Sequence, residues 1–560
     1  MTTNLDSLAL GSPAFPSQEF AALARSKGLL SAWRSLIKSE GNNSIRTVSG
    51  DFSVGFIDEA KRGFLAVDRF AVRSLCYRIV DGELHFAARA DELADSTSVV
   101  DPQAIFDYLY FHVIPSPRTI FKDIFRLPPG HFAVFENGSL KVSPYWVPEF
   151  CEIEKPSFLD LRTEFRQLLR NAVMQQLGSG KPGCFLSGGT DSSTVAGMVS
   201  EVSGQQAATY SIGFEADGYD EMEYARIAAR RFNTEHHEYY VTPDDLLKSI
   251  PAVAQYYDQP FGNSSALPAY YCAKMARDDG VRKILAGDGG DELFGGNTRY
   301  AKQKIFGFYD SVPSVVRNAV LEPLLIKTAL GKLPLARKAA SYIEQSKVPL
   351  PDRTQTYNLL FRLGLNNVFD PDFLADVDVT EPMVQQRAVW GQIESASQTN
   401  RELAFDWRYT LAECDLPKVV GTTAMAGIEV GFPMLDRSLV DFSIRLPTSY
   451  KLKGLNLRWF FKEALRGFLP NEILAKKKQG FGLPFGVWAA DNQKLRCLAE
   501  DSVRGLVERN ILRQDFVDTL FNRHLYEHPG YYGEMIWIAM MLEQWFRRDV
   551  KVRGDSAERR

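Results

Sequence analysis

The stretch SGGTDSS, residues 187–193, combines residue types that can hold a phosphate group. Glycines let the backbone approach a ligand closely and adopt positive φ. Backbone N–H groups at the start of a helix, together with serine hydroxyls, favour a phosphate oxygen. A simple glycine-rich turn is the alternative for Ser-Gly-Gly alone, and the lysine of a P-loop is absent. The full stretch predicts an anion cradle between a strand and a helix.

The elements that must position this cradle alternate between strand and helix patterns. Helix patterns occupy 159–177, 191–202 and 221–232, and apolar strand patterns occupy 183–186, 208–214, 235–241 and 281–286. Such alternation predicts an α/β fold with a parallel sheet flanked by helices. Ligands of such sheets bind at the carboxyl ends of the strands. From about residue 300 the chain is predicted to be mainly helical.

Residues before about 150 predict a different, β-rich domain. Short apolar runs cover 51–58, 63–70, 74–80 and 83–90, with the turn pair Asp81-Gly82 between the last two. A helix is expected before them, from Phe20 to Gly41. Proline-containing residues 145–158 are expected to be a linker. We therefore expect domains at 1–150 and 158–550, followed by a disordered tail at 551–560.

Composition excludes several classes of protein. The net charge is −4, so there is no basic excess to replace the counterions of a nucleic acid. No apolar run reaches the roughly 18 residues that span a bilayer, and the N-terminus does not resemble a signal peptide. The six cysteines are scattered, which argues against a zinc site or a disulfide framework. We expect a cytoplasmic protein that binds neither nucleic acid nor membrane.

SGGTDSS resembles the pyrophosphate loop of the ATP-pyrophosphatase superfamily, which cleaves ATP between its α and β phosphates. Over roughly residues 45–550 the chain resembles asparagine synthetases, because six further motifs follow in the family's order. These motifs are TYSIGF, GYDEMEYAR, TEHHE, LAGDGGDELFGG, GFPMLD and KKKQGFGLP. The resemblance implies a shortened Ntn-type (glutaminase-like) N-terminal domain and an ATP-pyrophosphatase domain.

The resemblance also implies roles for individual residues. Lys478 matches the family's catalytic lysine, which would offset charge on the α-phosphate. Asp288 matches an acidic residue beside the reacting carbonyl or the incoming amine. A solvated charge run is the alternative for Lys478. The substrate ATP and its Mg²⁺ would be held as follows: adenosine by Leu186, Ile212, Ala286 and Gly287, pyrophosphate by Ser187, Gly188, Gly189, Ser192 and Ser193, and Mg²⁺ by Asp191 and Asp291.

The start of the chain departs from the glutamine-using members of the family. Those members begin Met-Cys, and the freed cysteine is the nucleophile that takes ammonia from glutamine. Here the chain begins Met-Thr-Thr, and the family's CGI, HRG and NGE patterns are missing. Thr2 has the chemistry of an N-terminal nucleophile, but we predict no glutaminase activity and no effect of Thr2→Ala. β-Lactam synthetases and lasso-peptide cyclases resemble this Cys-less layout.

A second departure lies in the synthetase half. Lys418-Val419-Val420-Gly421 stands where relatives commonly read K-V-D-R, and Gly431 stands where an arginine is common. An amino acid with three charged groups needs paired charges once it is desolvated. Their loss favours a larger or less charged substrate, for which Gly421 and Gly431 would make room. Loss of structural ion pairs is the alternative.

Two histidine pairs are less informative. His524 and His528 would share a helix face and could bind a metal, but an ordinary surface helix is favoured. His236 and His237 point to opposite faces of a strand and are expected to be structural.

The sequence thus predicts an asparagine synthetase-like, AMP-forming amide ligase. It would adenylate a small-molecule or peptide carboxylate and transfer the acyl group to ammonia or an amine. The alternatives are a lactam- or peptide-cyclising enzyme and a non-catalytic nucleotide-binding scaffold. A homodimer is compatible with the sequence. The two substrates, a separate glutaminase and the oligomeric state stay open.

Overall fold

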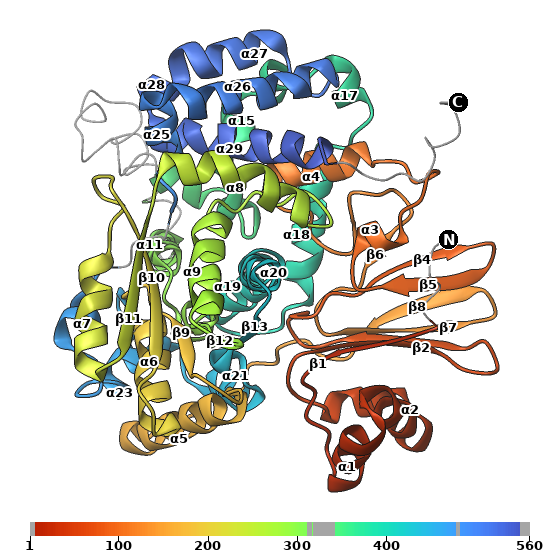
Figure 1. Ribbon diagram of the computed structural model, residues 1–560, viewed down its shortest axis with the longest axis vertical. Coiled ribbons are helices and arrows are strands. Elements are labelled where there is room, and N and C mark those ends of the chain that lie inside the picture. The colour runs from red at the N-terminus through yellow and green to blue at the C-terminus, as the bar shows by residue number, and fades with distance from the viewer. Residues whose placement is uncertain (1–5, 311–315, 317–341, 478–481, 549–560) are drawn as a thin grey trace.

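The N-terminal part of the chain, up to about residue 150 and called the N-terminal half below, folds into antiparallel sheets, as its alternating apolar runs predict (Figure 1). The computed structural model describes residues 6–310, 316, 342–477 and 482–548. One sheet has the order β1 (Ser7–Gly11), β2 (Phe52–Ile57), β3 (Gly63–Val67), β7 (His131–Glu136) and β8 (Ser139–Pro144). A smaller sheet has the order β5 (Glu83–Ala87), β4 (Cys76–Val80) and β6 (Phe125–Arg126).

The larger antiparallel sheet is covered on both faces. The helix expected from Phe20 to Gly41 is in fact two helices, because Gly28 has a φ of +88° and ends the first. These helices, α1 (Gln18–Lys27) and α2 (Leu29–Glu40), contribute Trp33 to a core with residues of β2 and β3. On the other face, β3 packs against the smaller sheet. The remaining helices of this half are η1 (Asn42–Thr47), α3 (Ala90–Leu93) and α4 (Pro102–Phe111).

The second half contains the predicted parallel sheet. Its order is β11 (Glu235–Val241), β10 (Ala208–Phe214), β9 (Gly183–Phe185), β12 (Lys283–Leu285) and β13 (Glu429–Gly431). Helices α6 (Thr190–Ser203) and α7 (Met222–Phe232) lie on one side and α9 (Ala266–Asp278) on the other (Figure 1). The predicted α/β class is therefore confirmed. Strand β13 was not predicted, because three residues that pair far along the chain give no local pattern. Further helices are α5 (Phe158–Gln176), α8 (Pro243–Tyr256) and α10 (Gly290–Phe294).

Residues after 297 are mainly helical, as predicted. The predicted tail at 551–560 lies outside the described residues. Within the described residues, no helix is both long and apolar enough to cross a membrane. The elements are α11 (Thr298–Asp310), η4 (Asp352–Gln355), α15 (Leu359–Leu363), α16 (Leu365–Val368), α17 (Pro371–Ala375), α18 (Glu381–Gln392), α19 (Gln398–Asp406), the π-helix η5 (Trp407–Asp415), α20 (Leu416–Ala426), η6 (Pro433–Leu435), α21 (Arg437–Arg445), α22 (Thr448–Lys451), β14 (Leu452–Lys453), β15 (Asn456–Leu457), α23 (Trp459–Ala464), α24 (Asn471–Ala475), α25 (Phe485–Asp491), α26 (Gln493–Glu508), α27 (Gln514–Thr519), η7 (Leu520–His524), α28 (Leu525–Glu527) and α29 (Pro529–Phe546).

The two halves pack directly on each other. One continuous apolar core contains buried residues from Phe70 to Trp545. Tyr108 of α4 donates a hydrogen bond to the carbonyl oxygen of Ile538 in α29, with an O···O distance of 2.9 Å. The expected linker at 145–158 has no regular element before α5, but Phe150 packs against the Trp407 ring. Domain boundaries at 150 and 158 stay a prediction.

Candidate active site

The SGGTDSS loop and the loop after β12 meet at the carboxyl ends of their strands. Gly188 has a φ of +70°, and a Cβ there would lie 2.5 Å from the backbone nitrogen of Ala225. A Cβ on Gly287 would lie 2.7 Å from the backbone nitrogen of Ser192. Only glycine fits these two positions. Gly188 lies against the backbone near the start of α7, and at Gly287 the two loops touch through their backbones. This contact brings their aspartates to one site.

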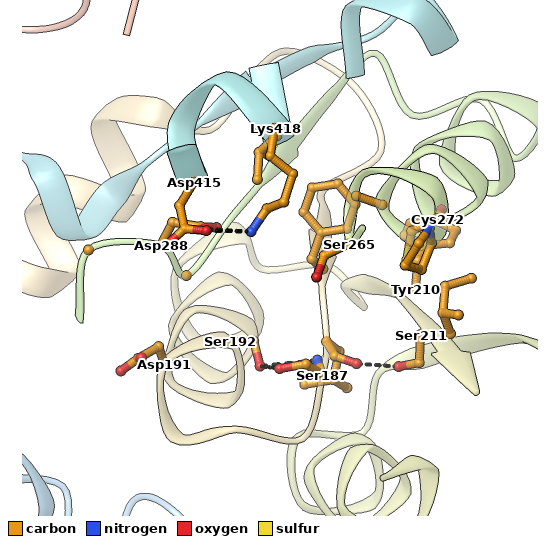
Figure 2. Close-up of a pocket in the computed structure, with 18 of the residues that line it drawn as sticks. Ser187, Asp191, Ser192, Tyr210, Ser211, Ser265, Cys272, Asp288, Asp415 and Lys418 are labelled. Carbon is orange, nitrogen blue, oxygen red and sulfur yellow. Dashed lines mark hydrogen bonds and ion pairs between the residues drawn. The ribbon is translucent and has the colours of Figure 1, made fainter. Parts of the chain in front are cut away.

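A cavity of about 340 Å³ opens between these loops, and we call it the nucleotide-loop cavity (Figure 2). Ser187 and Ser192 lie side by side on its wall, with 3.0 Å between their hydroxyl oxygens. Most residues that the sequence assigned to ATP and Mg²⁺ line it. They are Leu186, Ser187, Asp191, Ser192, Ile212, Gly287 and Asp291, and the predicted catalytic residue Asp288 lines the cavity as well.

Four of the assigned residues, Gly188, Gly189, Ser193 and Ala286, do not line this cavity. Gly188 is a buried residue of the loop, and the Ser193 hydroxyl is buried in α6 with no hydrogen-bond partner among the described residues. Ala286 is fully buried, and its backbone N–H donates to the carbonyl oxygen of Gly431. The roles predicted for Ser193 and Ala286 toward ATP stay predictions, and both side chains pack into the protein.

A second cavity, of about 790 Å³, shares Ser187, Asp191 and Ser192 with the first and is rich in cations. Gly189 lines this second cavity. Its basic residues are Arg458, Lys462, Lys476 and Lys477. Lys478 itself lies outside the described residues. An anion-binding loop that faces several cations suits a polyphosphate.

Asp191 and Asp291 share one guanidinium, that of Arg458. Arg458 donates from Nη1 and Nη2 to the two carboxylate oxygens of Asp191, at 2.8 and 2.6 Å, and its Nη2 also pairs with Asp291. Carboxylates that share a guanidinium are close enough to share a divalent cation, and hard oxygen ligands suit Mg²⁺. The two aspartates thus fit the predicted metal site. Sequence reasoning missed Arg458, which is separated from both aspartates by more than 160 positions.

Asp288 belongs to a second charged group on the wall of the nucleotide-loop cavity (Figure 2). Lys418 Nζ lies 3.8 Å from Asp288 and 3.0 Å from Asp415. Burial raises the pKa of the Asp288 carboxyl, and the Lys418 cation opposes this shift. Burial acts to lower the pKa of Lys418, but Asp415 and Asp288 outweigh it and raise the pKa. An ionised lysine thus lines the nucleotide-loop cavity beside two carboxylates.

Sequence reasoning missed the roles of Lys418 and Asp415. It compared Val420 and Gly421 with the family pattern and passed over Lys418, which does not depart from that pattern. Asp415 ends the π-helix η5, and Lys418 lies in the first turn of α20. Single π-helical segments often occur at functional sites, but the sequence gives no signal for them.

The expected space beside Gly421 and Gly431 is absent. A Cβ on Gly421 would lie 2.5 Å from the Tyr257 ring. A Cβ on Gly431 would lie 2.8 Å from both Gln176 and Leu285. Neighbouring side chains fill these positions, so the two glycines do not enlarge a substrate site.

The histidine pairs have structural partners. His524 is buried, unlike the expected surface helix, and its Nδ1 lies 3.0 Å from Glu527. His528 Nδ1 accepts from the backbone N–H of Tyr531 and caps α29.

Among the described residues, His237 lies in the one group of three or more His, Cys, Asp or Glu side chains whose ligand atoms all lie within 4.8 Å of one another. Its other members are Glu235 and Asp279. Lys181 Nζ lies 2.8 Å from Glu235 and 2.7 Å from Asp279. The lysine already supplies the cation of this group, in accord with a structural role for His237.

Comparison with known proteins identifies the family of this chain. A family model described as asparagine synthase matches residues 164–547, and one described as a glutamine amidotransferase domain matches residues 29–146. The chain belongs to the asparagine synthase family. The second match begins at residue 29, before the resemblance expected from about residue 45.

Several curated proteins are similar to most of the chain. Glutamine-hydrolyzing asparagine synthetase 1 of Bacillus subtilis is 24% identical over 498 residues, which cover 87% of this chain and 76% of that protein. Putative glutamine-hydrolyzing asparagine synthetase 2 of Methanocaldococcus jannaschii is 31% identical over 332 residues, covering 55% and 63%. Amidase chry2 of Gibberella zeae is 22% identical over 525 residues, covering 81% and 72%.

Proposed function

We propose that this protein is an AMP-forming amide ligase. One observation carries the proposal: Asp191, Asp288 and Asp291 meet at a cavity that shares its serine loop with a cation-lined one. The substrate carboxylate would attack the α-phosphorus of ATP, and the bond from that phosphorus to pyrophosphate would break. The amine would then attack the acyl carbon and expel AMP, losing a proton.

The residues divide this work by position. Ser187, Gly189 and Ser192 would hold phosphate oxygens, and Arg458 would meet them after it leaves the two aspartates. Mg²⁺ on Asp191 and Asp291 would neutralise charge on the triphosphate. Adenosine would lie against Leu186, Ile212 and Gly287. Lys418 would orient the reacting carboxylate beside Asp288, and Lys478 would stabilise charge on the α-phosphate.

The proposed function includes no glutaminase activity, because the CGI, HRG and NGE patterns of the glutamine-using relatives are missing from this sequence. Thr2 lies outside the described residues. The Bacillus relative bears the name of a glutamine-hydrolyzing enzyme, so Thr2→Ala is the direct check. Glutamine-dependent turnover that disappears in this variant would contradict the proposal.

The test uses purified protein with MgATP, aspartate and either ammonium or glutamine, with AMP, pyrophosphate and asparagine followed by mass spectrometry. Asparagine formed with ammonium alone is the expected result for an ammonia-dependent synthetase. AMP without asparagine, in the presence of other acids, would favour another carboxylate or a cyclisation. Lys478→Ala should impair amide formation. No AMP with any acid would favour a nucleotide-binding scaffold and overturn the proposal.

A further inference from the structure

A third cavity lies where the N-terminal half meets η5 and α29, and we call it the inter-half cavity. Its volume is about 400 Å³, within the range of ligand pockets. It shares no lining residue with the nucleotide-loop cavity. Its defining residues are Tyr110, Phe111, Arg299, Gln386, Tyr409 and Cys414.

Three polar atoms on this wall are buried without a hydrogen-bond partner among the described residues. They are the hydroxyl oxygens of Tyr110 and Tyr409 and Oε1 of Gln386. The Tyr110 and Gln386 side chains belong to residues that are only 3% and 2% exposed. Each unpaired buried group costs about 1–3 kcal/mol, and folded proteins contain few of them. Three at one cavity mark the polar positions that an occupant of the cavity would satisfy.

Aromatic rings form much of the remaining wall, and its charged groups have partners. Arg299 Nε lies 3.1 Å from Asp406, and His112 Nδ1 lies 3.6 Å from Glu534. The Phe111 ring stacks on Tyr409, with 5.5 Å between centroids, and Tyr110 packs edge-on against Phe361 at 5.7 Å. Tyr357 and Tyr531 also line the cavity, and Arg362 lies over both rings. Such a wall favours an apolar or aromatic body.

The unpaired atoms define the polar part of the ligand. The two phenol groups can donate to a carbonyl oxygen, and Gln386 Oε1 can accept from an N–H group. A carbonyl oxygen and an N–H group occur together in an amide. The cavity therefore fits a molecule with an amide bond and an apolar or aromatic group.

The inter-half cavity and the nucleotide-loop cavity have consecutive residues in their walls. Cys414 lines the former and the next residue, Asp415, lines the latter. Asn263 Nδ2 donates to Cys414 Sγ at 3.2 Å and fixes the Cys414 side chain at this boundary. A substrate whose carboxylate lies beside Lys418 and Asp288 can extend toward this cavity past the end of η5.

Resting on the proposed function, we infer that the inter-half cavity binds the part of the acyl substrate remote from its reacting carboxylate. This substrate is a peptide-like acid with an amide bond and an apolar or aromatic side chain. The room for a larger substrate is then here and not at Gly421 or Gly431.

Tyr409→Phe tests this inference, because it removes one unpaired hydroxyl and keeps the ring. With the dipeptide Ala-Phe as probe acid, the KM from pyrophosphate release should rise about tenfold, the effect of one lost hydrogen bond. The Kd of MgATP should not change, and the thermal stability should not fall. Ser53→Ala is the matched control: its hydroxyl is equally buried and unpaired, but it lies in β2 and lines none of the three cavities.

Calorimetric binding of Ala-Phe to protein saturated with α,β-methylene-ATP provides a readout without turnover. Tyr409→Phe should weaken this binding about tenfold, and an unchanged Kd or no binding would overturn the inference. Turnover of aspartate, with unchanged KM values for every acid in Tyr409→Phe, would overturn the inference while the proposed function stands. A rise in the KM of the amine alone would assign the cavity to the amine and contradict the inference. Binding of Ala-Phe without AMP formation from any acid would contradict the proposed function alone.

Discussion

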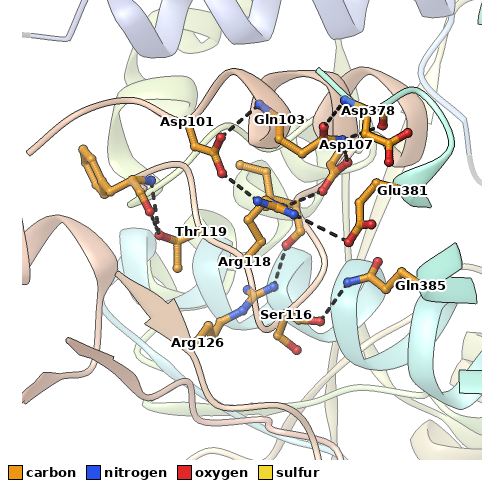
Figure 3. A network of polar contacts seen from close by, with 12 residues as sticks. Asp101, Gln103, Asp107, Ser116, Arg118, Thr119, Arg126, Asp378, Glu381 and Gln385 are labelled. Carbon is orange, nitrogen blue, oxygen red and sulfur yellow. Dashed lines mark hydrogen bonds and ion pairs between the residues drawn. The ribbon is translucent and has the colours of Figure 1, made fainter. Parts of the chain in front are cut away.

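The protein contains two groups of buried charges that differ in what surrounds them. At the nucleotide-loop cavity, Arg458 pairs with Asp191 and Asp291, and all three side chains border a cavity. Between the two halves, Glu413 pairs with Arg126 and Arg408 and accepts a hydrogen bond from the Ser116 hydroxyl at 2.7 Å. Figure 3 shows Arg126 and Ser116 in this second group.

The second group continues around Arg118 (Figure 3). Arg118 lies 2.7 Å from Asp101, 3.0 Å from Asp107 and 3.7 Å from Glu381. Burial raises the pKa of Asp107 to about 6, although Gln103 and Arg118 oppose the shift. Similar charge pairs thus have different roles in the two groups. Charges beside a cavity can exchange a protein partner for a ligand, whereas charges enclosed by both halves hold those halves together.

The largest effect is expected where the aspartates would hold the metal. Asp191→Asn or Asp291→Asn should reduce pyrophosphate release at least about 10³-fold, because charge on the triphosphate is no longer neutralised. Pyrophosphate release measures this effect. The control is Asp217→Asn, which changes an exposed residue after β10. Normal release in both variants would refute the metal assignment and the comparison with it.

Glu413→Ala should destabilise the fold by about 3–5 kcal/mol, because Arg126 and Arg408 are left buried without their carboxylate. Urea unfolding measures the change. Glu381→Ala, at a half-exposed position 3.7 Å from Arg118, should cost no more than about 1 kcal/mol. Equal losses in the two variants would show that the enclosed pair has no special structural role.

Lys418→Met should lower the rate of AMP formation about 10²-fold, because the reacting carboxylate loses its nearby cation. The pKa of Asp288 should rise further without Lys418, so the acidic limb of the pH–rate profile should move to higher pH. Lys418→Arg keeps the charge and should restore most of the rate. An unmoved acidic limb in the methionine variant would exclude Asp288 as the titrating group.

The smallest effect concerns Lys451, which is fully buried and donates to Asn400 Oδ1 at 2.9 Å. Burial lowers its pKa to about 7, and Glu152 partly opposes the shift. Between pH 7 and about 10.4 the unfolded chain binds this proton and the folded chain does not. Stability should therefore rise with pH in this window, by up to about 1.4 kcal/mol per pH unit.

Lys451→Met should flatten this dependence, as measured by urea unfolding from pH 7 to 9. Lys453→Met changes an exposed lysine of the neighbouring strand and should leave the slope unchanged. A slope that persists in Lys451→Met would assign the pH dependence to other groups.

Local patterns predicted the strands and helices around the SGGTDSS loop, because each has a period of its own within a few residues. The break at Gly28 was missed, since apolar spacing continues across it and only the positive φ ends the helix. Strand β13 was missed because its partner β12 lies more than 140 positions away. Asp191, Asp288 and Asp291 line one cavity because strand ends of a parallel sheet share an edge, and their roles stay predictions.

The sequence by itself determined the family, the α/β class and the loop residues of the site, because these depend on short motifs and local periodicity. Only the tertiary structure decided that Arg458 joins the two aspartates, that Lys418 lies between Asp288 and Asp415, and that Gly421 and Gly431 have no space beside them. The physical reason is the same in each case. Charge pairing and side-chain packing act across space, and residues distant in the chain leave no pattern in the sequence that joins them.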